Sequence, residues 1–221
     1  MKRLTTPLDT ARDFVRARMN TLADWLHRIT HGRLQPDHIT YIGFVMHIPV
    51  ALAIALDAFW LAAALLIVFG LFDALDGALA RVQSSDSDAG MLLDASTDRL
   101  KEVFIYTGAA YAMVTFLDEP IGAVWAVAAC GASLSVSYVK AKGETAVKDT
   151  SLSTSQVNKL FADGLMRFEV RMGVIIIGLI TNQLLPALVV VALLASYTAL
   201  ARLLRIQRTL KQNETKDAAK T

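Results

Sequence analysis

The chain has 221 residues, of which 54% are hydrophobic and only 19% are charged. Its mean hydropathy is +0.44, and a typical soluble domain carries roughly 25% charged residues. The net charge of +2 is uninformative as a total, and no nucleic-acid partner is expected. The single Cys130 excludes both an internal disulfide and a thiolate metal site. We therefore expect an all-α integral membrane protein rather than a soluble domain.

Residues 9 to 33 predict an amphipathic helix. Seven apolar residues keep helical spacing: Phe14, Val15, Met19, Leu22, Trp25, Leu26 and Ile29. Five arginines lie mostly off this stripe: Arg12, Arg16, Arg18, Arg28 and Arg33. This pattern favours a helix lying in the membrane interface over residues 1–33, with an ordinary surface helix as the alternative. No cleavable signal peptide is expected, because no compact apolar block precedes a cleavage site.

Six membrane-spanning helices are predicted over residues 34–210, since a span needs about 20 mostly apolar residues. The first covers 39–56, the second begins at Ala58, the third ends at Leu117, and the last three cover 121–139, 172–185 and 186–202. We expect tight turns at Asp57 and at 118–120. The polar stretch 143–171 predicts one short interfacial helix near 153–161, and the polar tail 211–221 is expected to be disordered.

Lysines and arginines are distributed unevenly along these elements. The connections near 57, 118 and 183 contain none, whereas the N-terminal helix, the 81–90 link, the 140–171 segment and the C-terminus hold nearly all of them. Basic residues mark the cytoplasmic side of a membrane protein. We therefore expect a multi-pass protein of the cell membrane with both termini in the cytoplasm.

Four carboxylates stand at the ends of the second and third predicted spans, where a charge is costly. Asp73 and Asp76 follow the uncharged run 58–72, and Asp94 and Asp98 precede the uncharged run 103–117. At a rise of about 1.5 Å per residue, Asp76 and Asp98 lie about 27 and 28 Å along their spans. The spacings i, i+3 and i, i+4 place each pair on one helix face. Two antiparallel helices can thus gather all four acids near one membrane face.

Carboxylates without histidine or cysteine partners favour hard cations such as Mg²⁺ or Mn²⁺, which complete their coordination with phosphate oxygens. Two such ions could clamp a diphosphate. Gly77 leaves room for a ligand beside Asp76, and Arg81 can pair with a phosphate or simply anchor the span end. His27 and His31 could also bind a metal, but no third ligand is near them in the sequence.

A cation transporter that uses the same acids is the alternative from another class, because carboxylates within spans often serve ion pathways. A transporter places such groups near the bilayer midplane. Here the acids lie at one face, together with an arginine and two glycines. That position suits a lipid headgroup better.

The spacing D-x-x-D-G-x-x-A-R-x8-G-x-x-x-D-x-x-x-D resembles the signature of the CDP-alcohol phosphatidyltransferase family. Every fixed position is met by a residue of this chain: Asp73, Asp76, Gly77, Ala80, Arg81, Gly90, Asp94 and Asp98. The hydropathy of the chain is also similar to that family's six spans with a juxtamembrane helix. A relative without activity that serves as a partner subunit is a third reading, which the complete motif disfavours.

The resemblance implies transfer of a phosphatidyl-type group from a CDP-activated lipid, such as CDP-diacylglycerol, to a small alcohol, with release of CMP. It implies that Asp73, Asp76, Asp94 and Asp98 hold two Mg²⁺ or Mn²⁺ ions and that Asp98 is also the general base. It implies contacts to the CDP-lipid from five residues: Asp37, Thr40, Gly77, Arg81 and Ser87. It further implies a homodimer.

The stretch 137–144 resembles the end of the fourth span in the phosphatidylinositol-phosphate synthase branch. In that branch, basic residues hold the phosphate of the acceptor, and the matching positions here are Lys140, Arg171 and Arg202. Each could instead be a positive anchor at a span end. We expect a phosphorylated polyol acceptor, most of all inositol phosphate. Glycerol 3-phosphate stays open as the alternative, because phosphatidylglycerophosphate synthases share the core motif.

Overall fold

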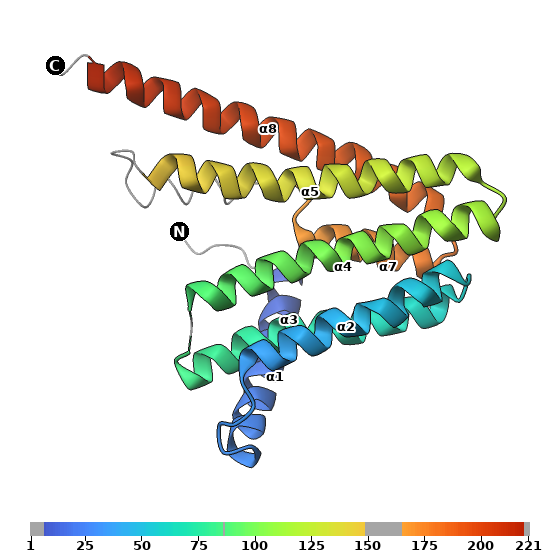
Figure 1. Ribbon diagram of the computed structural model, residues 1–221, viewed down its shortest axis with the longest axis horizontal. Coiled ribbons are helices and arrows are strands. Elements are labelled where there is room, and N and C mark those ends of the chain that lie inside the picture. The colour runs from blue at the N-terminus through green and yellow to red at the C-terminus, as the bar shows by residue number, and fades with distance from the viewer. Residues whose placement is uncertain (1–6, 86, 149–164, 219–221) are drawn as a thin grey trace. The chain divides into compact units, whose positions relative to one another are not determined.

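The computed structural model describes residues 7–85, 87–148 and 165–218. Every regular element within these ranges is a helix (Figure 1), which confirms the predicted all-α class. In chain order the helices are α1 (Pro7–Ile29), α2 (Pro36–Ala55), α3 (Phe59–Gln83), α4 (Asp88–Thr115), α5 (Pro120–Lys148), α7 (Phe168–Ile180) and α8 (Leu184–Ala218).

Four of these helices, α2, α3, α5 and α8, are long and apolar enough to cross a membrane. The third and fifth predicted spans fall on α4 and α7. Charged residues occupy the first half of α4, and its uncharged run begins only at Val103. Helix α7 has 13 residues, or about 20 Å at the helical rise. The count of six spans therefore stays a prediction.

The largest differences from the predicted helix boundaries concern α5, α7 and α8. Helix α5 continues to Lys148 instead of ending at Val139, and α7 ends at Ile180, ahead of the predicted end at Leu185. Helix α8 continues to Ala218, so the expectation of disorder is wrong for residues 211–218. Neither extension contains proline, and the α8 extension contains no glycine, so no strong helix breaker interrupts them. The helix predicted near 153–161 lies outside the described residues.

The predicted turns are confirmed. Gly32 has a φ of +74° directly after α1, and Asp57 and Asp118 have φ values of 60° and 50° at the two apolar turns. A left-handed backbone is most easily adopted by glycine and, among other residues, by Asn and Asp. Since α1 ends at Ile29, His31 lies in the turn and does not share a helix face with His27.

Residue contacts divide the chain into two units. The first comprises Met1–Leu52 and Leu61–Ile105, and it holds α1, most of α2 and α3, and the start of α4. Its core joins Ala23 of α1, Ile39 of α2 and Leu79 of α3. The apolar stripe of α1 is divided, because Met19 packs against this core whereas Phe14 and Trp25 are exposed.

The second unit comprises Ala53–Trp60 and Tyr106–Thr221. Within it, α5 and α8 lie along one another, and α7 packs against α8 (Figure 1). The turn from α7 to α8 needs a glycine, since a Cβ on Gly178 would lie 2.5 Å from the Cβ of Ala187.

Candidate functional site

Three of the four predicted acids converge in the first unit. Asp73 and Asp76 lie one turn apart on α3, and Asp94 lies near the start of α4. One carboxylate oxygen from each lies within 4.8 Å of those of the other two. As predicted, the i, i+3 spacing places Asp73 and Asp76 on one face of α3. The short link between α3 and α4 allows Asp94 to lie beside them.

Asp76 is the most constrained of the three acids. It is buried, and its Oδ2 accepts a hydrogen bond of 2.6 Å from the Thr40 hydroxyl on α2. Its Oδ1 accepts a second hydrogen bond from the backbone N–H of Gly77 at 2.6 Å. Both oxygens are thus fixed by neutral donors, which leaves the negative charge of the carboxylate uncompensated. Thr40, predicted to contact the CDP-lipid, lines the cavity described below and also orients this carboxylate.

Asp98 lies outside the group of three. Its Oδ1 accepts a hydrogen bond of 3.2 Å from Lys101 Nζ, and its Oδ2 lies 3.5 Å from Arg99 Nη2. Both cations belong to the same helix as Asp98. Lys101 Nζ also lies 2.5 Å from Asp73 Oδ1, so this lysine links Asp98 to one of the three acids.

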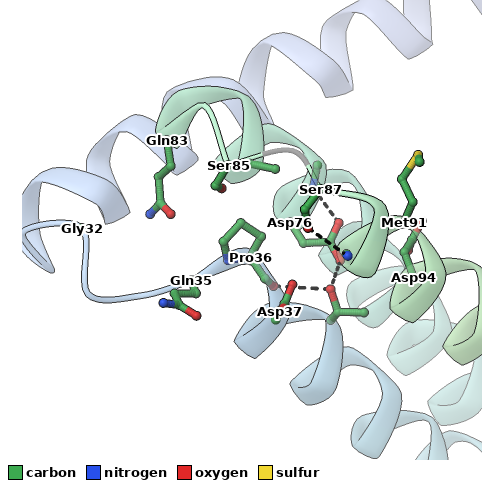
Figure 2. Close-up of a pocket in the computed structure, with 14 residues that line it drawn as sticks. Gly32, Gln35, Pro36, Asp37, Asp76, Gln83, Ser85, Ser87, Met91 and Asp94 are labelled. Atoms are coloured by element: carbon green, nitrogen blue, oxygen red, sulfur yellow. Dashed lines mark hydrogen bonds between the residues drawn. The ribbon is translucent and has the colours of Figure 1, made fainter.

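A cavity of about 410 Å³ opens beside the acids (Figure 2). It lies at the start of α2, at Pro36 and Asp37, and at the start of α4, at Ser87 and Gly90. Helix N-termini present free N–H groups and favour negatively charged ligands. The remaining wall is the C-terminal part of α3, with Asp76, Gly77, Ala80 and Gln83. Cation-binding carboxylates and anion-binding helix ends therefore line one hollow, as a metal-bound diphosphate requires.

The two motif glycines line this cavity for different reasons. A Cβ on Gly77 would meet only Arg81 Nη1, at 3.6 Å, so packing does not demand a glycine there and the space is free for a ligand. A Cβ on Gly90 would lie 3.2 Å from Ser87 Oγ, which accepts a 3.0 Å hydrogen bond from the Gly90 N–H. Ser87 is therefore the N-cap of α4, in addition to lining the cavity.

Arg81 is exposed and does not belong to the cavity lining. Its Nη2 donates a hydrogen bond of 3.2 Å to Asn20 Oδ1 on α1, while its Nη1 lies beside Gly77. Sequence reasoning did not find Asn20, because no motif includes it. It also missed Gln83, which lines the cavity and donates a 2.8 Å hydrogen bond to the Leu34 carbonyl.

The three predicted acceptor-binding residues lie in the second unit. Lys140 is 52% exposed and pairs weakly with Glu144 at 3.8 Å. Arg171 and Arg202 are both buried. Arg171 Nη1 donates to the Met166 carbonyl at 2.7 Å, and Arg202 Nη1 donates to the Val136 carbonyl at 3.1 Å. Arg202 Nε is buried without a partner among the described residues, although a buried charged donor normally has one.

The acid cluster fits a hard divalent cation. Its donors are all carboxylate oxygens, the set that Mg²⁺ and Mn²⁺ prefer. Burial and the neighbouring Asp98 raise the pKa of Asp94, which lies ahead of the apolar run of α4, above its ordinary value. Negative charge is therefore concentrated at a cost that a bound cation would relieve.

With this geometry established, comparison with known proteins identifies the class. The sequence model of the CDP-alcohol phosphatidyltransferase family matches residues 33–197, and the chain belongs to that family. The match begins after α1 and covers the whole acid motif.

Two curated relatives show which members of the family the chain is similar to. The chain is 33% identical over 131 residues to a phosphatidylinositol phosphate synthase of Cutibacterium acnes, over 58% of this chain and 60% of that protein. It is 28% identical over 210 residues to an archaetidylinositol phosphate synthase of Methanothermobacter thermautotrophicus, over 92% of this chain and 96% of that protein. The chain thus spans well under two thirds of the first relative.

The fold is similar to that of a solved phosphatidylinositol phosphate synthase of Mycobacterium tuberculosis. A structure of that protein with CDP-DAG bound has a TM-score of 0.72 at 21% identity, over 85% of this chain and 92% of that one. A structure in complex with manganese and citrate has a TM-score of 0.73 at 22% identity, over 86% and 88%. At such identities the likeness establishes the fold alone.

Proposed function

We propose that this protein is a metal-dependent membrane transferase that moves a phosphatidyl group from a CDP-diacylglycerol-type lipid to a phosphorylated polyol and releases CMP. One observation carries the proposal: three carboxylates within 4.8 Å of one another adjoin a cavity framed by two helix N-termini. Family membership and the CDP-DAG and manganese bound to the M. tuberculosis protein support it.

Asp73, Asp76 and Asp94 are the proposed ligands of two Mg²⁺ or Mn²⁺ ions, with Asp98 available to complete their coordination. When bound, such ions neutralise the diphosphate and stabilise the charge that develops on its oxygens. Thr40 and the Gly77 N–H orient Asp76 for this task. Asp37, Ser87 and the free space at Gly77 accommodate the CDP moiety, and Arg81 pairs with a phosphate at the edge of the cavity.

Asp98 is the proposed general base. It accepts the proton of the acceptor hydroxyl as that oxygen attacks the phosphorus that bears the lipid. The new bond joins the acceptor oxygen to phosphorus, the bond from phosphorus to the CMP oxygen breaks, and CMP leaves with the electron pair. Asp98 lies outside the group of three, and Lys101 and Arg99 fix the positions of its two oxygens.

Inositol phosphate is the proposed acceptor. The C. acnes and M. thermautotrophicus relatives are both named as inositol phosphate lipid synthases. Arg171 and Arg202, with Lys140, are proposed to hold the acceptor phosphate, because arginine and lysine side chains pair with phosphate oxygens. Glycerol 3-phosphate is the competing acceptor that the assay below tests.

We place the protein in the cell membrane with six spans, counting α4 and α7 with the four long apolar helices. Both termini and the acid site then face the cytoplasm, in accord with the distribution of lysine and arginine. The exposed side of the α1 stripe, which includes Phe14 and Trp25, lies in the membrane interface. A homodimer is part of the proposal, in keeping with the family.

The test uses the purified full chain with CDP-diacylglycerol, Mg²⁺ or Mn²⁺, and a panel of free and phosphorylated alcohols, with CMP as the readout. We expect CMP release with inositol phosphate and its loss on chelation. Asp94→Asn should lower turnover more than about 100-fold, since even outer-shell partners of a metal are worth 10–100-fold. Asp57→Asn is the matched control, because Asp57 is exposed at the far end of α3. CMP release by Asp94→Asn at the control rate would refute the proposal.

A further inference from the structure

Lys101 of α4 is a buried cation that the family motif does not contain. Its side chain is 1% exposed, and its Nζ lies 2.5 Å from Asp73 Oδ1 and 3.2 Å from Asp98 Oδ1. A buried ammonium group is costly unless it is paired. Lys101 is paired twice, once with an acid of the group of three and once with the acid outside that group.

The second cation on Asp98 is itself fixed. Arg99 lies against Asp98 Oδ2, and its Nη1 lies 3.0 Å from Glu102 Oε1. The Glu102 side chain is 0% exposed, so Arg99 is tied to a carboxylate that cannot move into solvent. Asp98 therefore has a cation on each oxygen, and both cations are anchored within one turn of its own helix.

The positive charge of Lys101 beside Asp73 opposes metal binding. A divalent cation drawn to Asp73, Asp76 and Asp94 must approach the ammonium group of Lys101, which repels it at short range in a poorly screened site. A lysine there thus lowers the affinity of the three acids for metal. A residue that merely stabilised the site would raise that affinity, so the sign of the effect separates the two roles.

We propose that Lys101 is a positioning residue that bridges Asp98 to Asp73 and, by its charge beside Asp73, limits how tightly the three metal-binding acids bind a divalent cation. The part that concerns Asp98 rests on the proposed transferase function. The part that concerns metal affinity does not, because it follows from the carboxylates and the lysine alone. A buried lysine at this place is compatible with function, because an ion that the protein binds with moderate affinity can still coordinate the phosphate oxygens of a substrate.

The experiment measures Mn²⁺ binding to the full-length protein without substrate, by the electron paramagnetic resonance signal of free Mn²⁺, together with kcat and KM. For Lys101→Met we expect the Mn²⁺ Kd to fall at least about tenfold. We expect kcat to fall about tenfold or more, because Asp98 is no longer positioned by Lys101. The CDP-lipid KM should stay within threefold of the wild-type value, because the nucleotide site is unchanged. Lys211→Met, an exposed lysine of α8, is the matched control and should change neither quantity.

Two further variants keep the test decisive if Lys101→Met does not fold. Lys101→Gln removes the charge but keeps an N–H donor, and it should also bind Mn²⁺ more tightly. Lys101→Arg keeps the charge, so its Mn²⁺ Kd should return to within threefold of the wild-type value. An unchanged or weaker Mn²⁺ affinity in folded Lys101→Gln would overturn the inference.

The two proposals fail in different ways. If the wild-type protein binds Mn²⁺ but no alcohol yields CMP, the transferase function fails while the effect of Lys101 on metal affinity can still be confirmed. If the wild-type protein yields CMP and the Lys101 variants bind Mn²⁺ like the wild type, the inference fails alone.

Discussion

The candidate carboxylates of the first unit and the candidate basic residues of the second unit differ in how the protein pairs their charges. In the first unit, two of the candidate carboxylates have partners on both oxygens: Asp76 contacts Thr40 and the Gly77 N–H, and Asp98 contacts Lys101 and Arg99. In the second unit, Arg202 is buried, its Nη1 donates to one backbone carbonyl, and its Nε has no partner within residues 7–85, 87–148 and 165–218. In the proposed function, the first group binds cations and accepts a proton, and the second group holds an anion. The predictions below test this difference.

The largest effect is expected at Asp98. Asp98→Asn should lower kcat about 10²- to 10⁴-fold, the range of general acid–base catalysis, because the amide cannot accept the proton of the acceptor hydroxyl. Mn²⁺ should still bind, since the group of three is intact. Steady-state kinetics and a Mn²⁺ titration on the same preparation check both points. A loss of metal binding as large as the loss of turnover would place Asp98 among the essential ligands instead.

A smaller and more selective effect is expected at Arg202. Arg202→Met should raise the KM for the phosphorylated acceptor about 10- to 100-fold, which corresponds to one charge-assisted hydrogen bond. The KM for the CDP-lipid should stay within about twofold. Arg205→Met, one turn along α8 and exposed, is the matched control. An equal rise of both KM values would contradict the separation of the two groups.

The smallest effect is expected at Thr40, whose role is to orient Asp76. Thr40→Val keeps the shape but removes the 2.6 Å hydrogen bond, so the Mn²⁺ Kd should rise about tenfold, at the lower end for an outer-shell partner. The control is Thr198→Val, since Thr198 is also buried but donates only to the Leu194 carbonyl of its own helix. Unchanged Mn²⁺ affinity in Thr40→Val would show that the hydrogen bond from Thr40 is not needed to orient Asp76 for metal binding.

Sequence reasoning succeeded where chemistry and spacing coincide on one helix. The interval from Asp73 to Asp76 is one helical turn, so the two acids had to share a face. The turns predicted at Asp57 and at 118–120 are present, and Asp57 and Asp118 adopt the left-handed backbone that aspartate tolerates. It failed at the C-terminal tail, where polarity was taken for disorder although no strong helix breaker interrupts the helix before Ala218.

The sequence by itself determined the helical class, the membrane character and the acids of the motif, because periodicity, hydropathy and spacing are local properties of the chain. Only the tertiary structure decided which acids meet. Lys101 of α4 joins Asp98 to Asp73 of α3, and the orientation of Asp76 depends on Thr40, 36 residues away in the chain. Such contacts arise from packing between helices, and no spacing within a single helix encodes them.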